Sequence, residues 1–295
     1  MAQDQSDWIT IRSTGLSATI DPQGAQLSLL RDAAERDLLW RGDPAVWAGR
    51  APILFPIVGM LVDGQYRSGG RRFALARHGF ARLRRFEVAE TGPASATFRL
   101  SADAQTRALY PFEFELDVNF AVEEATLALT AWIRNRGDGE MPASLGFHPA
   151  FAWPLPFGED RAAHFIEFER DEPAPIRRLD GHGLLTAEPS STPVENRRLQ
   201  LRDELFGSDA LIFDRIVSRS VTYGSEVGPR IAVGFPGVPY LGLWTRPGAD
   251  FICIEPWQGV ADAVGFSGEL KDKPGMLIVP PGKAACVGMT ISLLP

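Results

Sequence analysis

Residues 112–120 read FEFELDVNF, and this stretch decides the fold. Phenylalanine, leucine and valine hold every even position, whereas positions 113, 115, 117 and 119 hold Glu, Glu, Asp and Asn. Strict alternation with a period of two is typical of a β-strand that has one face in the core and the other in water. We therefore expect an antiparallel strand over 112–120 and a sheet built around it.

The same period recurs along the rest of the chain. Residues 125–135, ATLALTAWIRN, repeat it directly after the first stretch, and further short runs are DWITIRS, LSATIDP, ATFRLSA, RIAVGF, DFICIEP and AACVGMTISLL. The 29 glycines and 23 prolines of the chain separate these runs with turn signals. Many short strands joined by turns are the expected result.

Helical signals are weak by comparison. Residues 21–40, DPQGAQLSLLRDAAERDLLW, offer one or two helical turns interrupted by Gly24, and residues 202–213 predict a short helix before Asp209. Residues 154–193 are rich in Pro, Asp and Glu, which predicts a long excursion with a strand near HFIEFER. Because no linker divides the chain, we predict an all-β protein, with residues 1–295 forming a single domain, one large antiparallel β-sandwich.

The composition limits the class of partner. Apolar residues make up 45% of the chain, ample for a large core, and the net charge of −7 argues against a nucleic-acid backbone as partner. The opening MAQDQSDWIT has no basic segment followed by an apolar one, and no run of about 18 apolar residues would span a bilayer. We expect a cytoplasmic protein that binds neither nucleic acid nor membrane.

Three stretches combine a titratable side chain with rigid surroundings. They are ARHGFAR with His78 and Arg82, LGFHPAF with His148, and FICIEPWQGVAD with Glu255. A carboxylate that directly follows an apolar strand lies at the edge of the core, where burial raises its pKa and a neighbouring cation lowers it again. Taken singly, each stretch is more often structural, since a histidine beside aromatics fills cores and Glu-Pro often ends a strand.

Metal-binding patterns are missing. Two histidines and a glutamate are able to bind zinc, but the HExxH and HxH spacings are absent. Cys253 and Cys286 lie in alternating runs and form neither a disulfide framework nor a metal-site spacing. His164 and His182 lie in polar contexts and predict surface positions. We expect no metal and no other cofactor.

Together these stretches give the chain a resemblance to the aldose 1-epimerase (galactose mutarotase-like) family, in particular its bacterial branch. The resemblance runs in order through nearly the whole chain: GAQLSLL, DLLWRGDPAVWAGRAPILFPIVG, RHGFAR, GFHPAF, DALIF, LGLWTRPGADFICIEPWQGVAD and KPGMLIVPPGK. The combination of HGFAR, GFHPAF and EPW is specific, whereas any one of them alone is not. The resemblance implies a galactose mutarotase-like supersandwich and action on a hexose without a cofactor.

The resemblance also implies roles for individual residues. Glu255 matches the general base at the anomeric hydroxyl, and His148 matches the acid that protonates the ring oxygen. His78 matches a second imidazole near the ring oxygen or the neighbouring hydroxyls. Asp209, in DALIF, is a looser match to the aspartate that holds sugar hydroxyls.

The guanidinium that holds the sugar is less well matched. Many members of the family carry an arginine before the HG segment, at a position that falls near Met60 here, so Arg50 or Arg82 is expected to replace it. Trp244 and Trp257 are expected to stack on the apolar face of a pyranose, with core filling as an equal alternative.

The chemistry of anomer exchange suits these residue types. Opening the hemiacetal removes a proton from O1 and adds one to the ring oxygen O5, which requires a base and an acid. A carboxylate with an ordinary pKa of about 4.3 is a base at neutral pH, and an imidazole near 6.5 exchanges protons there. Pro149 restricts His148 to extended backbone angles, and Phe147 and Phe151 are expected to limit its rotamers.

Three alternatives stay open. A hexose-6-phosphate 1-epimerase requires a basic cluster for the phosphate. A glycosidase requires a second carboxylate about 5–9.5 Å from Glu255, either Asp209 or Asp262. A carbohydrate-binding protein without turnover would keep the sandwich but not the catalysis. The candidates for the basic cluster are Arg50, Arg82, Arg84 and Arg85.

Overall fold

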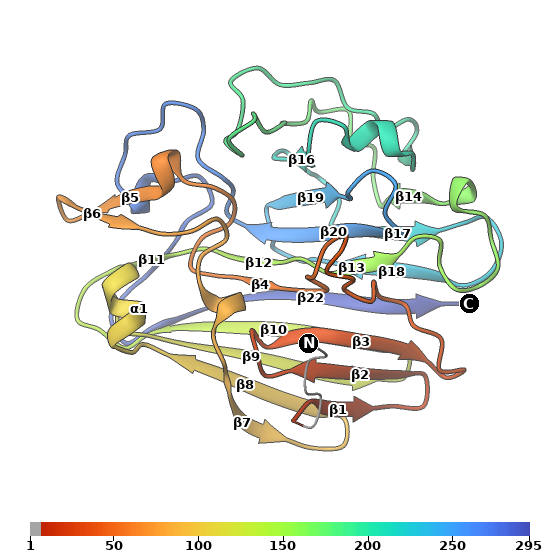
Figure 1. Ribbon diagram of the computed structural model, residues 1–295, viewed down its shortest axis with the longest axis horizontal. Helices are drawn as coiled ribbons and strands as arrows, with labels where there is room; N and C mark the ends of the chain where they lie inside the picture. The colour runs from red at the N-terminus through yellow and green to blue at the C-terminus, as the bar shows by residue number, and fades with distance from the viewer. Residues whose placement is uncertain (1–6) are drawn as a thin grey trace.

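Two large antiparallel sheets dominate the computed structural model, which describes residues 7–295 (Figure 1). The larger sheet has nine strands. In spatial order they are β15 (Arg198–Gln200), β14 (Phe165–Phe168), β17 (Ser220–Gly224), β18 (Arg230–Gly234), β22 (Ala284–Leu294), β10 (Thr126–Asn135), β9 (Phe114–Glu123), β8 (Ser95–Ser101) and β7 (Glu87–Thr91).

The second sheet has six strands and carries the functional pocket described below. Its order is β16 (Leu211–Phe213), β19 (Tyr240–Trp244), β20 (Phe251–Gln258), β12 (Leu145–Phe147) and β4 (Ile53–Leu54), with β13 (Ala150–Ala152) also paired to β20. All seven residues from Phe251 to Trp257 are buried, so both faces of β20 are covered. A fully covered central strand gives the site a rigid base.

Smaller elements cover the two large sheets. The strands β1 (Ile9–Arg12), β2 (Leu16–Asp21) and β3 (Gln26–Asp32) form a separate sheet that contacts β8, β9 and β10. The hairpin of β5 (Gln65–Ser68) and β6 (Arg71–Ala74) forms one two-stranded sheet, and β11 (Met141–Ala143) pairs with the distant β21 (Leu277–Val279) in another. The helices are α1 (Ala104–Leu109) and 3₁₀ turns at Val62–Gly64, Ala81–Leu83, Arg161–Ala163, Asp203–Phe206 and Leu270–Asp272.

The core lies between the sheets. One cluster of buried apolar side chains runs from Ile11 to Ile291 and includes Phe147 of the six-stranded sheet and Leu129 of the nine-stranded sheet. The prediction of an all-β antiparallel sandwich is thereby confirmed. Among residues 7–295, none of the helices has the length and apolarity needed to cross a bilayer.

The structure confirms most of the predicted strands but not all of the predicted helical turns. The strand predicted over 112–120 is β9, displaced to Phe114–Glu123, and the predicted strand near HFIEFER is β14. The 3₁₀ turn Asp203–Phe206 matches the short helix expected before Asp209. The helical turns expected within 21–40 are wrong, because no helix lies there and Gln26–Asp32 is the strand β3. Gly24 (φ 77°) provides a turn after β2, so that β3 pairs with β2.

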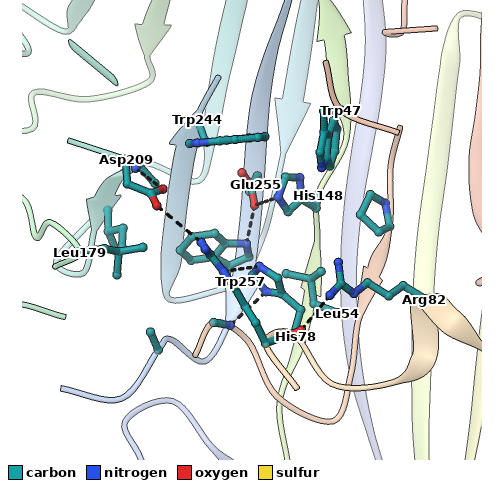
Figure 2. Close-up of a pocket in the computed structure, with 16 residues that line it drawn as sticks. Trp47, Leu54, His78, Arg82, His148, Leu179, Asp209, Trp244, Glu255 and Trp257 are labelled. Atoms are coloured by element: carbon teal, nitrogen blue, oxygen red, sulfur yellow. Dashed lines mark hydrogen bonds and ion pairs between the residues drawn. The ribbon is translucent and has the colours of Figure 1, made fainter. Parts of the chain in front are cut away.

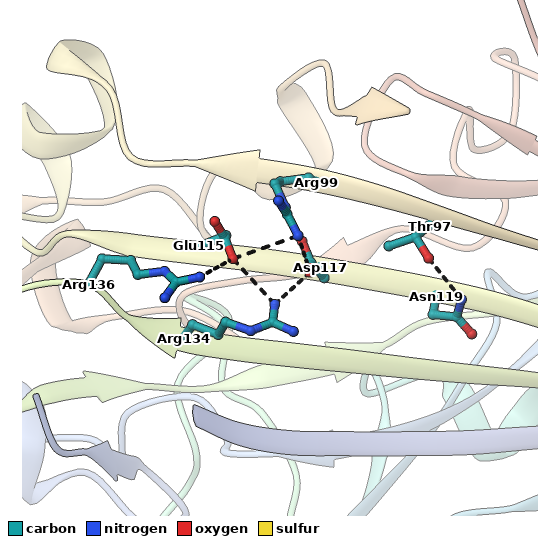
Figure 3. A network of polar contacts seen from close by, with 7 residues as sticks. All are labelled: Thr97, Arg99, Glu115, Asp117, Asn119, Arg134 and Arg136. Atoms are coloured by element: carbon teal, nitrogen blue, oxygen red, sulfur yellow. Dashed lines mark hydrogen bonds and ion pairs between the residues drawn. The ribbon is translucent and has the colours of Figure 1, made fainter. Parts of the chain in front are cut away.

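The polar face of β9 carries an ion-pair network rather than a simple wet surface (Figure 3). Asp117 is only 5% exposed and accepts two hydrogen bonds from Arg99, at 2.6 Å from Nε and 2.7 Å from Nη2. Arg134 Nη1 lies 2.5 Å from the same carboxylate, while Glu115 accepts from Arg136 at 2.8 Å. The bidentate contact ties β8 to β9 across the sheet.

Replacing Asp117 with asparagine is therefore expected to cost stability in a pH-dependent way. Burial alone would raise the pKa of Asp117, but hydrogen bonds and charge from Arg99 and Arg134 outweigh it and lower the pKa below the ordinary 3.8. A depressed carboxyl pKa stabilises the fold above the ordinary pKa, and this stabilisation is lost as the pH falls through the folded-state pKa. We expect Asp117→Asn to lower the free energy of unfolding by about 1–3 kcal/mol at pH 7.

Urea unfolding of the variant and the wild type at pH 7 and at a pH below the lowered pKa of Asp117 measures this effect. The gap between them is expected to close at the lower pH. Asn119→Ala is the matched control on the same strand, because Asn119 donates to Thr97 Oγ1 at 2.9 Å without a charge. Its loss of stability is expected to be smaller and the same at both pH values. An equal, pH-independent loss in both variants contradicts the role of the ion pair.

Candidate functional site

A pocket of about 290 Å³ opens over the six-stranded sheet. Such a volume lies near the lower end of the range typical of small-molecule sites, which suits a single sugar ring. Its lining combines apolar side chains with a small set of titratable and aromatic ones (Figure 2). That set is Trp47, Arg77, His78, Arg82, His148, Asp209, Trp244, Glu255 and Trp257.

Glu255 is placed by the central strand of this sheet. The alternation of β20 puts Cys253, Glu255 and Trp257 on one face, and Glu255 is 1% exposed. Its Oε2 accepts a hydrogen bond from Trp257 Nε1 at 3.2 Å and lies 3.1 Å from His148 Nε2. The carboxylate is thus held inside the pocket wall rather than at its rim.

His148 lies between β12 and β13 and is enclosed by aromatic rings. Trp47 stacks on the imidazole with ring centroids 5.2 Å apart, and Trp244 meets its edge at 5.9 Å. Phe147 and Phe151 instead belong to the main core cluster, so the rings expected to hold the imidazole are not the ones that stack on it. Within residues 7–295, the buried Nδ1 of His148 has no hydrogen-bond partner.

His78 sits on a turn that only glycine completes. His78 (φ 67°) and Gly79 (φ 71°) both adopt the left-handed conformation, and a Cβ on Gly79 would lie 2.2 Å from the Phe55 carbonyl oxygen. The turn is fixed to Gly59, whose amide donates to His78 Nδ1 at 3.1 Å and whose carbonyl accepts from the His78 amide at 2.9 Å. These bonds orient the imidazole toward the pocket, with its ring 5.9 Å from that of His148.

Arg77 is a pocket residue that our sequence analysis did not single out. Its Nη2 lies 3.8 Å from the Asp209 carboxylate, and its Nε lies 3.2 Å from His78 Nε2. The pocket lining includes Arg77 but not Met60, where the family arginine was expected. The sequence feature that could have identified Arg77 is its position directly before His78, because the left-handed turn there brings both side chains to the same cavity. Trp47 was also missed, since the loop that carries it shows no pattern.

The two arginines named in advance lie in different places. Arg82 lines the pocket, donates from Nη2 to the Arg77 carbonyl at 3.0 Å, and keeps its Nε buried without a partner in the described chain. Arg50 does not line the pocket. Its Nη1 donates to the Ser28 carbonyl at 2.9 Å, and its guanidinium lies over the Trp8 ring. The structure thus brings together all the named site residues except Arg50.

Burial dominates the electrostatics of the site. It raises the pKa of Glu255 well above the ordinary value, although Arg77 and the indole N–H of Trp257 act in the opposite direction. Burial, with the charges of Arg77 and Arg82, lowers the pKa of His148 to about 3. Burial likewise lowers the pKa of His78 well below 6.5. The expectation of an imidazole that titrates near neutral pH therefore does not hold in the free protein, where both rings are neutral.

Three donor groups of the site lie close enough to approach one metal ion. The ligand atoms of His148, Cys253 and Glu255 are all within 4.8 Å of one another. However, burial raises the pKa of the Cys253 thiol well above its ordinary value, so the sulfur stays protonated and is a poor ligand. A metal-free reaction stays our prediction.

Two other titratable residues are placed differently from what the sequence suggested. His164 is buried, not on the surface, and its Nε2 accepts from the Leu155 amide at 3.0 Å. Its polar neighbours in sequence concealed this, because the ring that packs against it, Tyr223 at 5.6 Å between centroids, comes from the distant strand β17. His182 is exposed, as expected. Asp262 does not line the pocket but forms a buried ion pair with Lys273 and accepts from the Val62 amide at 2.9 Å.

Comparison with known proteins gives a consistent result. The family model described as aldose 1-epimerase matches residues 7–186. Protein LacX, chromosomal, of Lactococcus lactis subsp. lactis is 34% identical over 283 residues, which cover 92% of this chain and 95% of LacX. A galactose mutarotase related enzyme from Lactobacillus acidophilus matches with a TM-score of 0.90 and 29% identity, covering 98% of this chain and 97% of that one.

A second solved structure agrees with the first. A galactose mutarotase-like protein from Lactobacillus casei matches with a TM-score of 0.90 at 28% identity, over 97% of this chain and 99% of that protein. The similarity covers both large sheets and therefore includes the strands that carry the pocket. Fold, sequence and family model agree, and the chain belongs to the aldose 1-epimerase family.

Proposed function

We propose that this protein is an aldose 1-epimerase that interconverts the α and β anomers of a hexose without a cofactor. The observation that carries the proposal is the contact between His148 Nε2 and Glu255 Oε2, 3.1 Å apart in the wall of a pocket of sugar size. O1 and O5 of an aldose are bonded to the same carbon, so an adjacent acid and base reach both. Within residues 7–295, neither group forms an ion pair with any other residue.

In the proposed reaction, Glu255 and His148 each transfer one proton when the ring opens and one when it closes. Glu255 takes the proton of O1, the O1 electrons form the C1 carbonyl, and the C1–O5 bond breaks as His148 gives a proton to O5. Rotation about C1–C2 turns the other face of the carbonyl toward the new hydroxyl. The two residues then exchange roles, and ring closure returns both protons. A positioned acid or base typically contributes about 10²–10⁴-fold to the rate.

The other pocket residues are suited to binding the sugar. Asp209 and Arg77 offer acceptors and donors for hydroxyl groups, and Figure 2 shows Asp209 and Arg82 on opposite sides of the catalytic pair. The Gly59 amide donates to Nδ1 of His78 and Arg77 Nε donates to its Nε2, so contacts at both nitrogens hold the imidazole in place at the wall of the pocket. Trp244 and Trp257 line the cavity with apolar surface on which a pyranose ring is able to stack.

Polarimetry tests the proposal directly. Freshly dissolved α-D-glucose or α-D-galactose is expected to reach its equilibrium rotation faster in the presence of the protein than without it. Running glucose 6-phosphate in parallel distinguishes a hexose enzyme from a sugar-phosphate enzyme. Binding of a hexose by calorimetry without accelerated rotation would instead identify a carbohydrate-binding protein.

Contacts outside the pocket weigh against the sugar-phosphate alternative and against one of the two carboxylates considered for a glycosidase. The basic cluster expected for a phosphate is dispersed, because Arg84 pairs with Asp103, Arg85 pairs with Asp7, and Arg50 bonds a backbone carbonyl. Asp262 does not serve as a second glycosidase carboxylate, since Lys273 occupies it.

Removing the guanidinium of Arg77 is expected to weaken sugar binding more than turnover. Arg77→Gln is expected to raise KM by about 10-fold or more, because a hydrogen bond from a charged donor is worth about 1.5–3 kcal/mol, while kcat changes less. Initial polarimetric rates over a range of sugar concentrations give both constants. Arg50→Gln is the matched control and is expected to keep the wild-type KM. A raised KM in the control but not in Arg77→Gln would instead favour Arg50, one of the two arginines that the sequence left open.

A further inference from the structure

The indole of Trp257 lies flat against the sheet because the neighbouring strands offer it glycine. A Cβ on Gly242 of β19 would lie 2.4 Å from Cη2 of the indole, and one on Gly146 of β12 would lie 2.8 Å from its Cδ1. Contacts under 3 Å are essentially never tolerated by packed side chains. Neither glycine has a positive φ, so their backbone conformation does not require glycine. Glycine is needed at both positions because a side chain there would collide with the indole. The two glycines thereby fix the plane of the ring.

The fixed plane of the indole directs its one polar atom, Nε1, toward Glu255. Trp257 is 6% exposed, and its Nε1 donates to Glu255 Oε2 at 3.2 Å. The same oxygen lies 3.1 Å from His148 Nε2. The other oxygen, Oε1, accepts no hydrogen bond from any donor in residues 7–295. The two carboxylate oxygens of Glu255 are therefore not equivalent.

We propose that Trp257 is a positioning residue for the base, which holds Oε2 of Glu255 and leaves Oε1 to take the proton from the sugar. The inference rests on the proposed function. When His148 turns from Glu255 to the ring oxygen of the sugar, it withdraws from Oε2. The indole N–H is then the donor that remains on this oxygen, so it keeps the carboxylate oriented through the step in which the proton moves.

The same contact sets how readily the carboxylate ionises. A hydrogen bond from a neutral N–H to a carboxylate favours the charged form, and its loss disfavours that form. Trp257→Phe keeps the ring and removes the N–H. We expect the titration of the Glu255 carboxyl to move to higher pH by about one unit, which is a tenfold change in its ionisation equilibrium, and kcat/KM to fall by about 10-fold or more.

Infrared difference spectroscopy measures the titration without any need for catalysis. The carboxyl band of Glu255 is the one missing in Glu255→Gln, and its pH dependence is followed in the wild type and in Trp257→Phe. Gly242→Ala provides a second route to the same result, because the added methyl group displaces the indole and moves its N–H away from Oε2 of Glu255, although Trp257 itself is unchanged. Both variants are expected to move the titration upward.

The matched control is Trp244→Phe, which removes an indole N–H from the same pocket without a bond to Glu255. This variant changes sugar affinity but is expected to keep the wild-type titration. An unshifted titration in Trp257→Phe and Gly242→Ala, or an equal shift in the control, overturns the inference. A wild-type protein that does not accelerate anomer exchange but shows the shift overturns the proposed function and leaves the positioning contact intact.

Discussion

Glu255→Gln is expected to lower kcat/KM for anomer exchange by about 10²–10⁴-fold, the range for loss of a positioned base. Glutamine has the shape of the glutamate side chain and still contacts Trp257, but its amide does not take a proton from O1. Polarimetry with a fresh single anomer measures the loss. Because sugar binding depends on other groups, calorimetry is expected to give a hexose affinity close to that of the wild type.

The same substitution is expected to stabilise the fold at neutral pH. Burial raises the pKa of Glu255, so above about pH 4.5 the unfolded state ionises while the native carboxyl stays protonated, and the protein loses stability from there up to the raised pKa. Glutamine removes this cost, and the Tm of Glu255→Gln at pH 7 is expected to exceed that of the wild type. Below about pH 4.5 the glutamate is protonated in both the folded and unfolded states, and the difference is expected to vanish.

The two measurements together identify a functional carboxylate. Replacing a residue that serves only packing lowers the stability of the protein and leaves its activity intact. Replacing Glu255 is expected to raise stability and lower activity. Asp262→Asn is the matched control, because Asp262 is also buried but is paired with Lys273 outside the pocket. It is expected to lose stability. Near-wild-type kcat/KM in Glu255→Gln would remove Glu255 from the mechanism.

The sequence predicted what depends on local periodicity. The alternation in β9 and β10 reports which side chains face the core, and the apolar run before Glu255 reports a covered strand. These features depend on neighbours within the same strand. The strand β3 was harder to predict, because its residues 26–32 do not alternate cleanly and its conformation is decided by pairing with β2 across the turn at Gly24.

The sequence did not predict what depends on side chains meeting from distant segments. Trp47 reaches His148 from a loop about a hundred positions earlier, and no pattern in that loop marks it. Arg84 and Arg85 appear in the sequence as part of one basic cluster with Arg82, but the structure sends each to a different partner. A run of charged residues in the sequence does not show where each side chain points. The backbone turn at His78 and Gly79 does determine where the side chains beside it point.

The largest revision concerns the protonation of Glu255 and His148, the proposed acid–base pair. The sequence suggested a carboxylate beside an imidazole near pKa 6.5, but burial reverses the order of the two pKa values. When the pair holds one titrating proton in the free protein, that proton is on Glu255 and His148 is neutral. The arrangement that opens the sugar has the proton on His148 instead. Both arrangements contain the same number of protons, so pH does not interconvert them.

His148→Asn is expected to lower kcat by about 10²–10⁴-fold, because asparagine fills similar space but does not give up a proton to O5. Sugar affinity measured by calorimetry is expected to stay within a few-fold of the wild-type value. Trp47→Phe serves as the matched control, since it keeps an aromatic ring against the imidazole and leaves the acid in place. A His148→Asn variant with wild-type kcat would exclude His148 as the acid.

The pH dependence of the wild type distinguishes this pair from an ordinary solvated histidine. The pair keeps its single titrating proton from about pH 3, the pKa of His148, up to the raised pKa of Glu255, and kcat/KM is expected to be level in between. Activity is then lost as the pH rises through the Glu255 pKa, because the proton needed by O5 leaves the pair. A solvated histidine acting as the acid would instead reduce kcat/KM above about pH 6.5. A fall in kcat/KM centred near pH 6.5 would show that His148 ionises independently of Glu255 and would contradict the proposal that the two residues share one proton.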